Sequence, residues 1–447
     1  SGRLCASYPN NEGSKVFMQS KFHTLRTLRE FILLWLTQSL SALGSAMTSF
    51  ALVIWSYQQT GSALSTALLS ISSYAPYVVM SIFAGAMSDK WDKKRTMLLC
   101  DLFAALTSVT VLILIKTGSL AIWHLYLINA LNRLMNTIQN PASIVSVTLL
   151  VPKEHYQLVS GLQSFSRSLV TVLTPIFASA ALALFGLDAV IAFDLSTCAV
   201  AMATLLLFIR IPGAPDNGEM HESVFAAAKA GLRYLKQNRG ILDLILFLAA
   251  INFTASVYEA ALAPLLLSRL NGGQAALGMV NASIGIATLA GSAIASLSPT
   301  PRSRVRVIMD SLLFSMSTEN LMLAFGRTVP VWCLAGVLGW LFIPVMSANM
   351  DTLFRHTIPA EMQGRVYSAR NTLQFFTIPL GYFLGGVLVD RVFEPLMAKV
   401  PGNCLIVQLI GSGKGSGAAL LLLTLSVPGI MTCLFFRKDR HIWALER

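Results

Sequence analysis

The chain has 447 residues, of which 55% are hydrophobic and only 12% are charged, and its formal net charge is +12. A soluble globular protein carries roughly 25% charged residues, so this composition excludes a water-soluble fold. The basic residues form short clusters between apolar segments, which excludes a nucleic-acid surface and indicates a multi-pass membrane protein. The six cysteines show neither metal-ligand spacing nor a disulfide framework.

Twelve apolar segments are long enough to cross a bilayer as helices, each of which needs about 20 residues. We expect these helices at 31–57, 63–87, 96–115, 120–148, 156–184, 187–210, 240–268, 275–297, 304–325, 329–354, 365–391 and 414–436. Residues 1–17 are polar and begin without Met, so we expect them to be upstream or non-native sequence. No cleavable signal peptide is recognisable.

A polar segment in the middle of the chain divides the helices into two groups of six. It begins with the turn-forming run Pro212–Pro215, and from about Ser223 it predicts an amphipathic helix at the membrane surface. Residues 394–413 contain Pro395 and Pro401 and predict an outer loop. The expected parts are an N-terminal segment (1–29), an N-terminal six-helix bundle (30–210), a linker (211–239), a C-terminal six-helix bundle (240–436) and a tail (437–447).

Lysine and arginine are much denser in one set of connections than in the other, which predicts the orientation in the membrane. The dense set includes the clusters at 90–95, 229–239, 302–306 and 437–440, whereas the other set carries single residues such as Lys116 and Lys399. The dense set is expected to face the cytoplasm, and twelve spans then place both termini there.

A repeat of 207 residues relates the two halves. Pro152, Val159 and Gln163 of the first half correspond to Pro359, Val366 and Arg370 of the second half at this offset. A repeat of this length within apolar helices indicates two equivalent bundles that face a central site, the architecture of many secondary transporters.

The loop after the second span carries a recognisable motif. Gly85 is followed four residues later by Asp89 and then by the basic residues Lys93, Lys94 and Arg95. This pattern resembles the signature loop of the major facilitator superfamily. Asn140-Pro141-Ala142, Arg210-Ile211-Pro212 and Gly364-Arg365-Val366 resemble the macrolide-efflux branch of its drug exporters. The resemblance covers residues 30–440.

The resemblance implies an all-α protein with twelve transmembrane helices in two pseudo-symmetric bundles. It also implies a secondary transporter of the bacterial cell membrane that exports a hydrophobic or amphiphilic compound, such as a macrolide-type drug, by proton antiport and rocking of the bundles. Asp89 would then act as a cytoplasmic latch on the helix that begins near Arg365, where the helix dipole favours an anion.

Ionisable residues inside a membrane are costly and therefore suggest function. Arg133 lies midway along the fourth span and resembles an arginine that the superfamily links to proton coupling. Glu259 in the seventh span lies among apolar residues, where the neutral form that a proton carrier needs is favoured. Asp194 in the sixth span is a third candidate. Each has a structural alternative: an ion pair for Arg133, a position at the outer mouth for Glu259, and helix packing for Asp194.

Polar and aromatic residues of the first, fourth, seventh and tenth spans are expected to line the substrate cavity, as these spans do in the superfamily. The fourth span has a polar face because its polar residues recur at spacings of three and four. The candidates are Gln38, Asn132, Asn136, Gln139, Asn252, Tyr258, Trp340 and Asn349. Bundle packing is the alternative role for each.

Other kinds of site are not supported. The run Gly411–Gly417 has glycines and a lysine, but it lacks the spacing of a Walker phosphate loop. Neither a metal site nor a hydrolase nucleophile turn is recognisable, so we expect a monomeric non-enzyme without cofactor, whose partners are the bilayer, protons and a small substrate. The alternatives are a lysophospholipid flippase, an exporter of a siderophore or peptide natural product, and a non-transporting membrane receptor.

Overall fold

The computed structural model of the chain describes residues 28–152, 155–211 and 224–446, with the side chains of 81–90 outside the description. Residues 1–17 and the linker turn at 212–223 therefore lie outside the described residues. Everything described forms helices and their connections. The first six long helices are α2 (Arg29–Thr60), α3 (Ala63–Lys90), α4 (Lys93–Lys116), α5 (Ile122–Leu150), α6 (Tyr156–Phe185) and α7 (Leu187–Leu207).

The second six spans are less regular. They are α9 (Arg239–Ser268), α10 (Gln274–Leu297), α11 (Arg304–Phe325), the pair α12 (Val329–Trp340) and α13 (Ile343–Thr357), the pair α14 (Ala360–Phe375) and α15 (Thr377–Val387), and α18 (Ser416–Arg437). The break between α12 and α13 comes just before Pro344, whose missing amide cannot continue a helix. A π-helical turn, Leu388–Phe393, follows α15.

Ten of these spans in the described residues are apolar enough to cross a membrane. The other two, α5 and α11, are long enough but carry several polar residues, and they complete the twelve transmembrane helices that the sequence predicts. The observed ends agree with the expected ends to within a few residues, because the length of an apolar stretch is a local property of the sequence.

The prediction of a loop at 394–413 was wrong for two stretches of that segment. It contains two short helices, α16 (Glu394–Lys399) and α17 (Leu405–Ile410). Pro395 lies in the first turn of α16, where its missing amide leaves no hydrogen bond unmade, so it begins this helix instead of preventing it.

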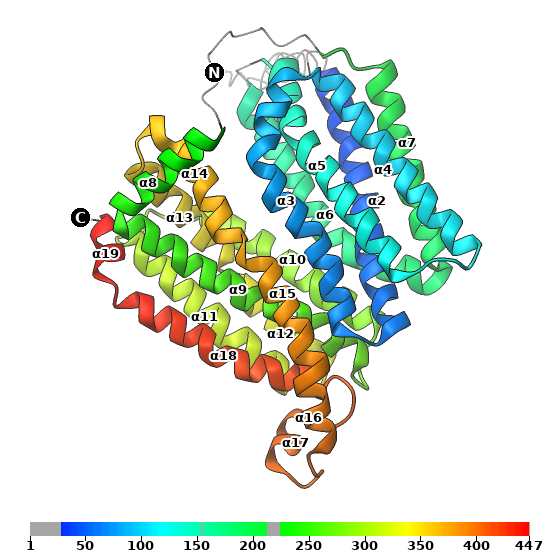
Figure 1. Cartoon of the computed structure of the whole chain (residues 1–447), viewed down its shortest axis with the longest axis vertical. Coiled ribbons are helices and arrows are strands. Elements are labelled where there is room, and N and C mark those ends of the chain that lie inside the picture. Colours follow the sequence, from blue (N-terminus) through cyan, green and yellow to red (C-terminus); the bar gives the residue numbers. More distant parts are fainter. Residues whose placement is uncertain (1–27, 153–154, 212–223, 447) are drawn as a thin grey trace, which may run out of the picture.

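The two groups of helices lie side by side as two lobes, with α2–α7 in one and α9–α18 in the other (Figure 1). Helix α3 packs against α15, and α6 packs against α10, so these pairs join the halves. Small residues permit the close approach: a Cβ atom at Gly278 of α10 would lie 2.2 Å from Ser179 Oγ, and one at Gly386 would lie 2.7 Å from Leu64 Cα.

The bundle has two ends. We call the end where α2 and α9 begin the tail end, because the C-terminal helix α19 (Arg440–Trp443) packs there against α9. Ile442 is buried, and Glu446 accepts hydrogen bonds from Ser303 Oγ (2.7 Å) and the Val305 amide (2.7 Å) at the start of α11. We call the opposite end, which carries α16 and α17, the cap end (Figure 1).

The linker contains the expected amphipathic helix, α8 (Val224–Gln237), at the tail end. It lies against α14, and a Cβ atom at Gly231 would be 2.3 Å from the Arg365 carbonyl oxygen. Its apolar face buries Leu235. The helix therefore packs on protein along this face.

Candidate functional site

A cavity of about 370 Å³ lies inside the first half, between α2, α4, α5 and α7. The polar face of α5 forms one wall, because residues three and four apart share a helix face. Its polar and charged lining includes Gln38, Asp101, Asn132, Arg133, Asn136, Gln139 and Asp194. The structure thus brings together two of the three coupling candidates and four of the expected cavity residues.

Asp101 of α4 is one of two buried acids in this cavity. Its carboxylate accepts hydrogen bonds from Gln38 Nε2 (3.1 Å) and Gln139 Nε2 (2.6 Å), which come from α2 and α5. It makes no ion pair with any residue that the structure describes. Two neutral donors thus hold a carboxylate that is only 7% exposed.

Asp194 of α7 is the second buried acid. Its carboxylate accepts hydrogen bonds from Ser45 Oγ (2.9 Å) and Ser108 Oγ (3.1 Å), on α2 and α4. Gly44 makes this approach possible, because a Cβ atom there would lie 2.9 Å from Asp194 Cα. Asp194 therefore serves helix packing and faces the cavity at the same time.

Arg133 lies on the cavity wall, and its guanidinium carbon is 5.3 Å from the centre of the Tyr77 ring. Such a cation–π contact contributes roughly 0.5–2 kcal/mol. Within the described chain Arg133 forms no ion pair. The cavity therefore combines one arginine with two carboxylates that neutral groups hold apart from it.

A second cavity, of about 410 Å³, lies inside the other half between α9, α11, the broken tenth span and α14. Glu319 of α11 is buried in its wall and accepts hydrogen bonds from Tyr258 Oη (2.6 Å) and Trp340 Nε1 (3.0 Å). Asn252 also lines this cavity. Asn349 is not part of the lining and instead accepts a hydrogen bond from Arg304 (3.4 Å).

Glu319 is a residue that the sequence reasoning did not single out as a site. An acid well within a predicted membrane span is the signal that marks it. Glu259, the carboxylate singled out in its place, follows Tyr258 directly on α9, lines neither of the two cavities, and has no hydrogen-bond partner among the described residues. One helical step therefore decides which side chain reaches the cavity.

Arg370 of α14 provides the cation of the second cavity. It contacts Asp351 (3.5 Å) and Gln374 Oε1 (3.1 Å), and its guanidinium carbon is 4.8 Å from the Phe354 ring centre. Asp310, which follows Asp101 by 209 positions and so lies close to the repeat offset, is instead half-exposed and pairs with Arg437 at 3.0 Å. The repeat therefore does not give these two acids the same surroundings.

The signature loop is only partly described. Gly85 and Asp89 belong to the last turns of α3, and their side chains lie outside the described residues. Lys94 Nζ donates to the carbonyl oxygens of Leu206 (3.1 Å) and Ile209 (2.7 Å), at the end of α7, where the helix dipole favours a cation. Lys93 donates to the Trp91 carbonyl oxygen, and the Arg95 amide donates to the Asp92 carboxylate, which caps α4.

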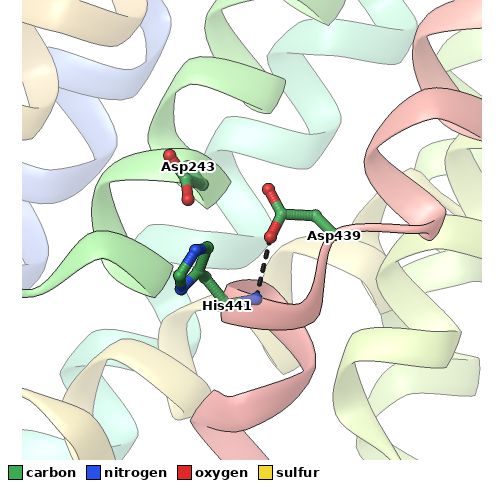
Figure 2. A group of neighbouring side chains, drawn as sticks. All are labelled: Asp243, Asp439 and His441. Carbon is green, nitrogen blue, oxygen red and sulfur yellow. Dashed lines mark hydrogen bonds between the residues drawn. The ribbon is translucent and has the colours of Figure 1, made fainter.

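The fold also assembles a cluster that the sequence spacing does not reveal. Asp243 of α9 meets Asp439 and His441 of the tail, with one potential ligand atom of each within 4.8 Å of the others (Figure 2). Asp439 Oδ1 already accepts a hydrogen bond from the His441 amide (2.8 Å), which caps α19. The backbone is also close here, since a Cβ atom at Gly240 would lie 2.3 Å from the His441 carbonyl oxygen. The cluster thus belongs to the docking of the tail.

Comparison with known proteins places this geometry in context. A model of the family described as Major Facilitator Superfamily matches residues 34–382. Macrolide efflux protein A of Streptococcus pyogenes is 24% identical over 81% of this chain and 90% of that protein. Multidrug efflux pump Tap of Mycolicibacterium fortuitum is 23% identical over 81% of this chain and 90% of that protein.

Solved structures agree on the fold. The nucleoside transporter NupG superimposes with a TM-score of 0.67 at 13% identity, over 92% of this chain and 98% of its own. A bacterial homolog of the human lysosomal transporter Spinster, inward-facing and occupied, also gives 0.67, at 14% identity, over 94% of this chain and 98% of its own.

Proposed function

Because the chain belongs to the Major Facilitator Superfamily and is similar to its macrolide-efflux branch, we propose that it is a proton-coupled exporter of a hydrophobic or amphiphilic compound. The relatives named as efflux pumps support the direction of transport. The tail end, with the denser lysine and arginine, faces the cytoplasm of a bacterial cell, and the cap end faces outward. Both termini are then cytoplasmic.

The proposed proton coupling rests on a set of three buried carboxylates. Asp101, Asp194 and Glu319 line the two cavities, and neutral donors hold each of them. A carboxylate within a membrane is expensive when no cation neutralises it, so these acids need a use. Binding and releasing protons is that use, because the protonated form removes the electrostatic cost that the charged form carries.

Glu319 is the leading proton carrier in this proposal. It is 5% exposed, and Tyr258 and Trp340 both donate to its Oε1 atom. Arg133 is the positive charge of the opposite half, where it offsets part of the negative charge that Asp101 and Asp194 carry when protons leave. Glu259, at the neighbouring position to Tyr258 on α9, stays a candidate for a relay because it too lies within a span and has no described hydrogen-bond partner.

Transport follows from rocking of the two halves about this site. The described structure has the cap end closed, with Asp390 and Ser268 of one half bonded to Ser62 and Tyr57 of the other. Asp89, at the opposite end of α3, is proposed to bond the amides at the start of α14 when the tail end closes. The second and eleventh spans would then be joined by an acid at each end, Asp390 at the cap end and Asp89 at the tail end.

The substrate contacts come from apolar and aromatic side chains beside the acids. Trp340, Met346 and Met350 line the second cavity. Methionine is flexible and polarizable, so such a wall adapts to compounds of different shape. This composition supports an amphiphilic substrate, and macrolides are the first compounds to test, since related proteins carry that name.

The test is macrolide accumulation in a pump-deficient bacterium that expresses the chain. We expect lower accumulation with the wild type, restored by a protonophore, and no such effect with Glu319→Gln or Arg133→Ala. Asp310→Asn is the matched control, because Asp310 lies on the same helix as Glu319 but is 48% exposed and pairs with Arg437. Equal accumulation in all strains, with the protein present in the membrane, would contradict the proposal and make lysophospholipids the next substrates.

A further inference from the structure

A separate basic cavity of about 390 Å³ lies at the cap end, away from the transport site. It lies where the α9–α10 connection, the α11–α12 connection and the loop before α18 meet. Arg269, Arg327 and Lys414 line it, and no described acidic residue belongs to the lining. Three cations that share one small cavity repel each other unless an anion lies between them.

Arg269 shows that a hydrogen-bond acceptor is missing. Its Nε and Nη2 atoms are buried and have no hydrogen-bond partner in the described chain. A buried charged donor without an acceptor is costly. The nearby acid, Glu394, attracts Arg269 electrostatically but accepts no described hydrogen bond from it, and its Oε1 atom accepts hydrogen bonds from the amides of Gly415 (3.0 Å) and Ala418 (3.2 Å) at the start of α18.

The loop that completes the cavity adds further donors. Gly411 and Gly413 have φ angles of +95° and +87°, and Gly415 has +85°. These positive φ angles, which favour glycine, turn the loop sharply, and successive backbone amides in a turn can form a concave surface that binds anions. The amides of Ser412, Gly413 and Lys414 donate to no other described residue. Gly411 also lies beside Arg269, since a Cβ atom there would be 2.8 Å from Arg269 Nη1.

We propose that this cavity binds a phosphate group, supplied either by inorganic phosphate or by the headgroup of an anionic phospholipid. A phosphate offers several acceptor oxygens to the guanidinium fork, the lysine ammonium and the loop amides together. The glycine-rich run Gly411–Gly417 thus acts as an anion loop without the Walker spacing that nucleotide hydrolysis requires. Ser268 of the lining also makes the cap-end contact with Tyr57, so the site is tested by ligand binding and not by transport.

The first experiment titrates the purified full chain in detergent with inorganic phosphate by calorimetry at constant ionic strength. We expect saturable binding, roughly tenfold weaker in Arg269→Gln and a few-fold weaker in Lys414→Ala, as loss of a charge-assisted hydrogen bond predicts. Lys399→Ala is the control, because Lys399 is exposed at the same end but does not line the cavity. Absence of saturable binding, or equal binding by Lys414→Ala and wild type, overturns the site for free phosphate.

The second arm places the protein in nanodiscs of phosphatidylcholine with or without phosphatidylglycerol. If phosphatidylglycerol competes with phosphate, and the competition is lost in Lys414→Glu, the site binds a lipid headgroup. If phosphate binds equally well with and without phosphatidylglycerol, the site binds the free ion. If neither phosphate nor phosphatidylglycerol binds in either experiment, the proposal is overturned. Because Lys414 is exposed, Lys414→Glu also tests the site if Arg269→Gln fails to fold. A protein that binds phosphate but exports nothing would refute only the proposed transport.

Discussion

Asp390 and Ser62 join the two halves of the molecule at the cap end through a hydrogen bond of 2.6 Å, although 328 positions separate them in the chain. The same carboxylate accepts the amides of Ala63 (2.9 Å) and Leu64 (2.9 Å), the first residues of α3. An anion at a helix N-terminus is stabilised by the helix dipole as well as by these bonds. Asp390 therefore holds the eleventh span on the start of the second span.

Asp390→Ala is expected to open the cap end. Hydrogen bonds to a charged group contribute about 1.5–3 kcal/mol, which corresponds to a shift of roughly ten- to a hundredfold in the closed-to-open ratio. Distances between spin labels at Gln58 and Leu270, measured by electron resonance, should lengthen. Asp188→Ala is the control, because Asp188 pairs with Lys116 within one half. Unchanged label distances in Asp390→Ala would show that Asp390 is not the latch.

Glu319→Gln is expected to abolish coupling while the fold persists. The amide keeps an acceptor for Tyr258 and Trp340 but has no carboxylate proton to exchange. Transport driven by a pH gradient in proteoliposomes should fall at least tenfold, and substrate addition should no longer release protons. The thermal midpoint should stay the same or rise, since a costly buried acid is removed. Full gradient-driven transport by this variant would assign coupling elsewhere, with Glu259→Gln tested next.

Gly44→Ala is expected to destabilise the first half. A Cβ atom at Gly44 would lie 2.6 Å from Thr197 Oγ1 and 2.9 Å from Asp194 Cα, so α2 and α7 must separate. Overpacking of this kind typically costs about 1–3 kcal/mol. Gly161→Ala is the control, because a Cβ atom at this helical position of α6 meets nothing within 4 Å. Thermal unfolding in detergent should separate the two variants, and equal midpoints would refute the close approach.

Ile442→Ala is expected to loosen the tail from α9. Ile442 is fully buried in the core at the tail end, and truncating a buried isoleucine costs roughly 2–5 kcal/mol. Hydrogen exchange at the start of α9 and at α19 should then speed up, while α2–α7 keep their protection. Arg440→Ala removes an exposed neighbour and should leave exchange unchanged. Uniform exchange rates across both variants would contradict a docked tail.

The sequence alone was sufficient to predict features that depend only on residues close together in the chain. Although the break that divides the tenth span into α12 and α13 was not predicted, the twelve spans follow from apolar length. The polar face of α5 is similar: Asn132, Asn136 and Gln139 share a side of the helix because of its 3.6-residue period, and the structure places all three on one cavity.

The partners of the charged residues depended on the tertiary structure. Glu319 meets Tyr258 across 61 positions, Asp390 meets Ser62 across 328, and Asp243 meets His441 of the tail. Such pairs depend on how each helix is rotated and how closely it crosses its neighbour, and small residues at the crossings decide this. Hydrophobic length alone carries no information about helix rotation, so the sequence determined that this chain spans a membrane twelve times, and the packing of the helices decided which acids face the cavities.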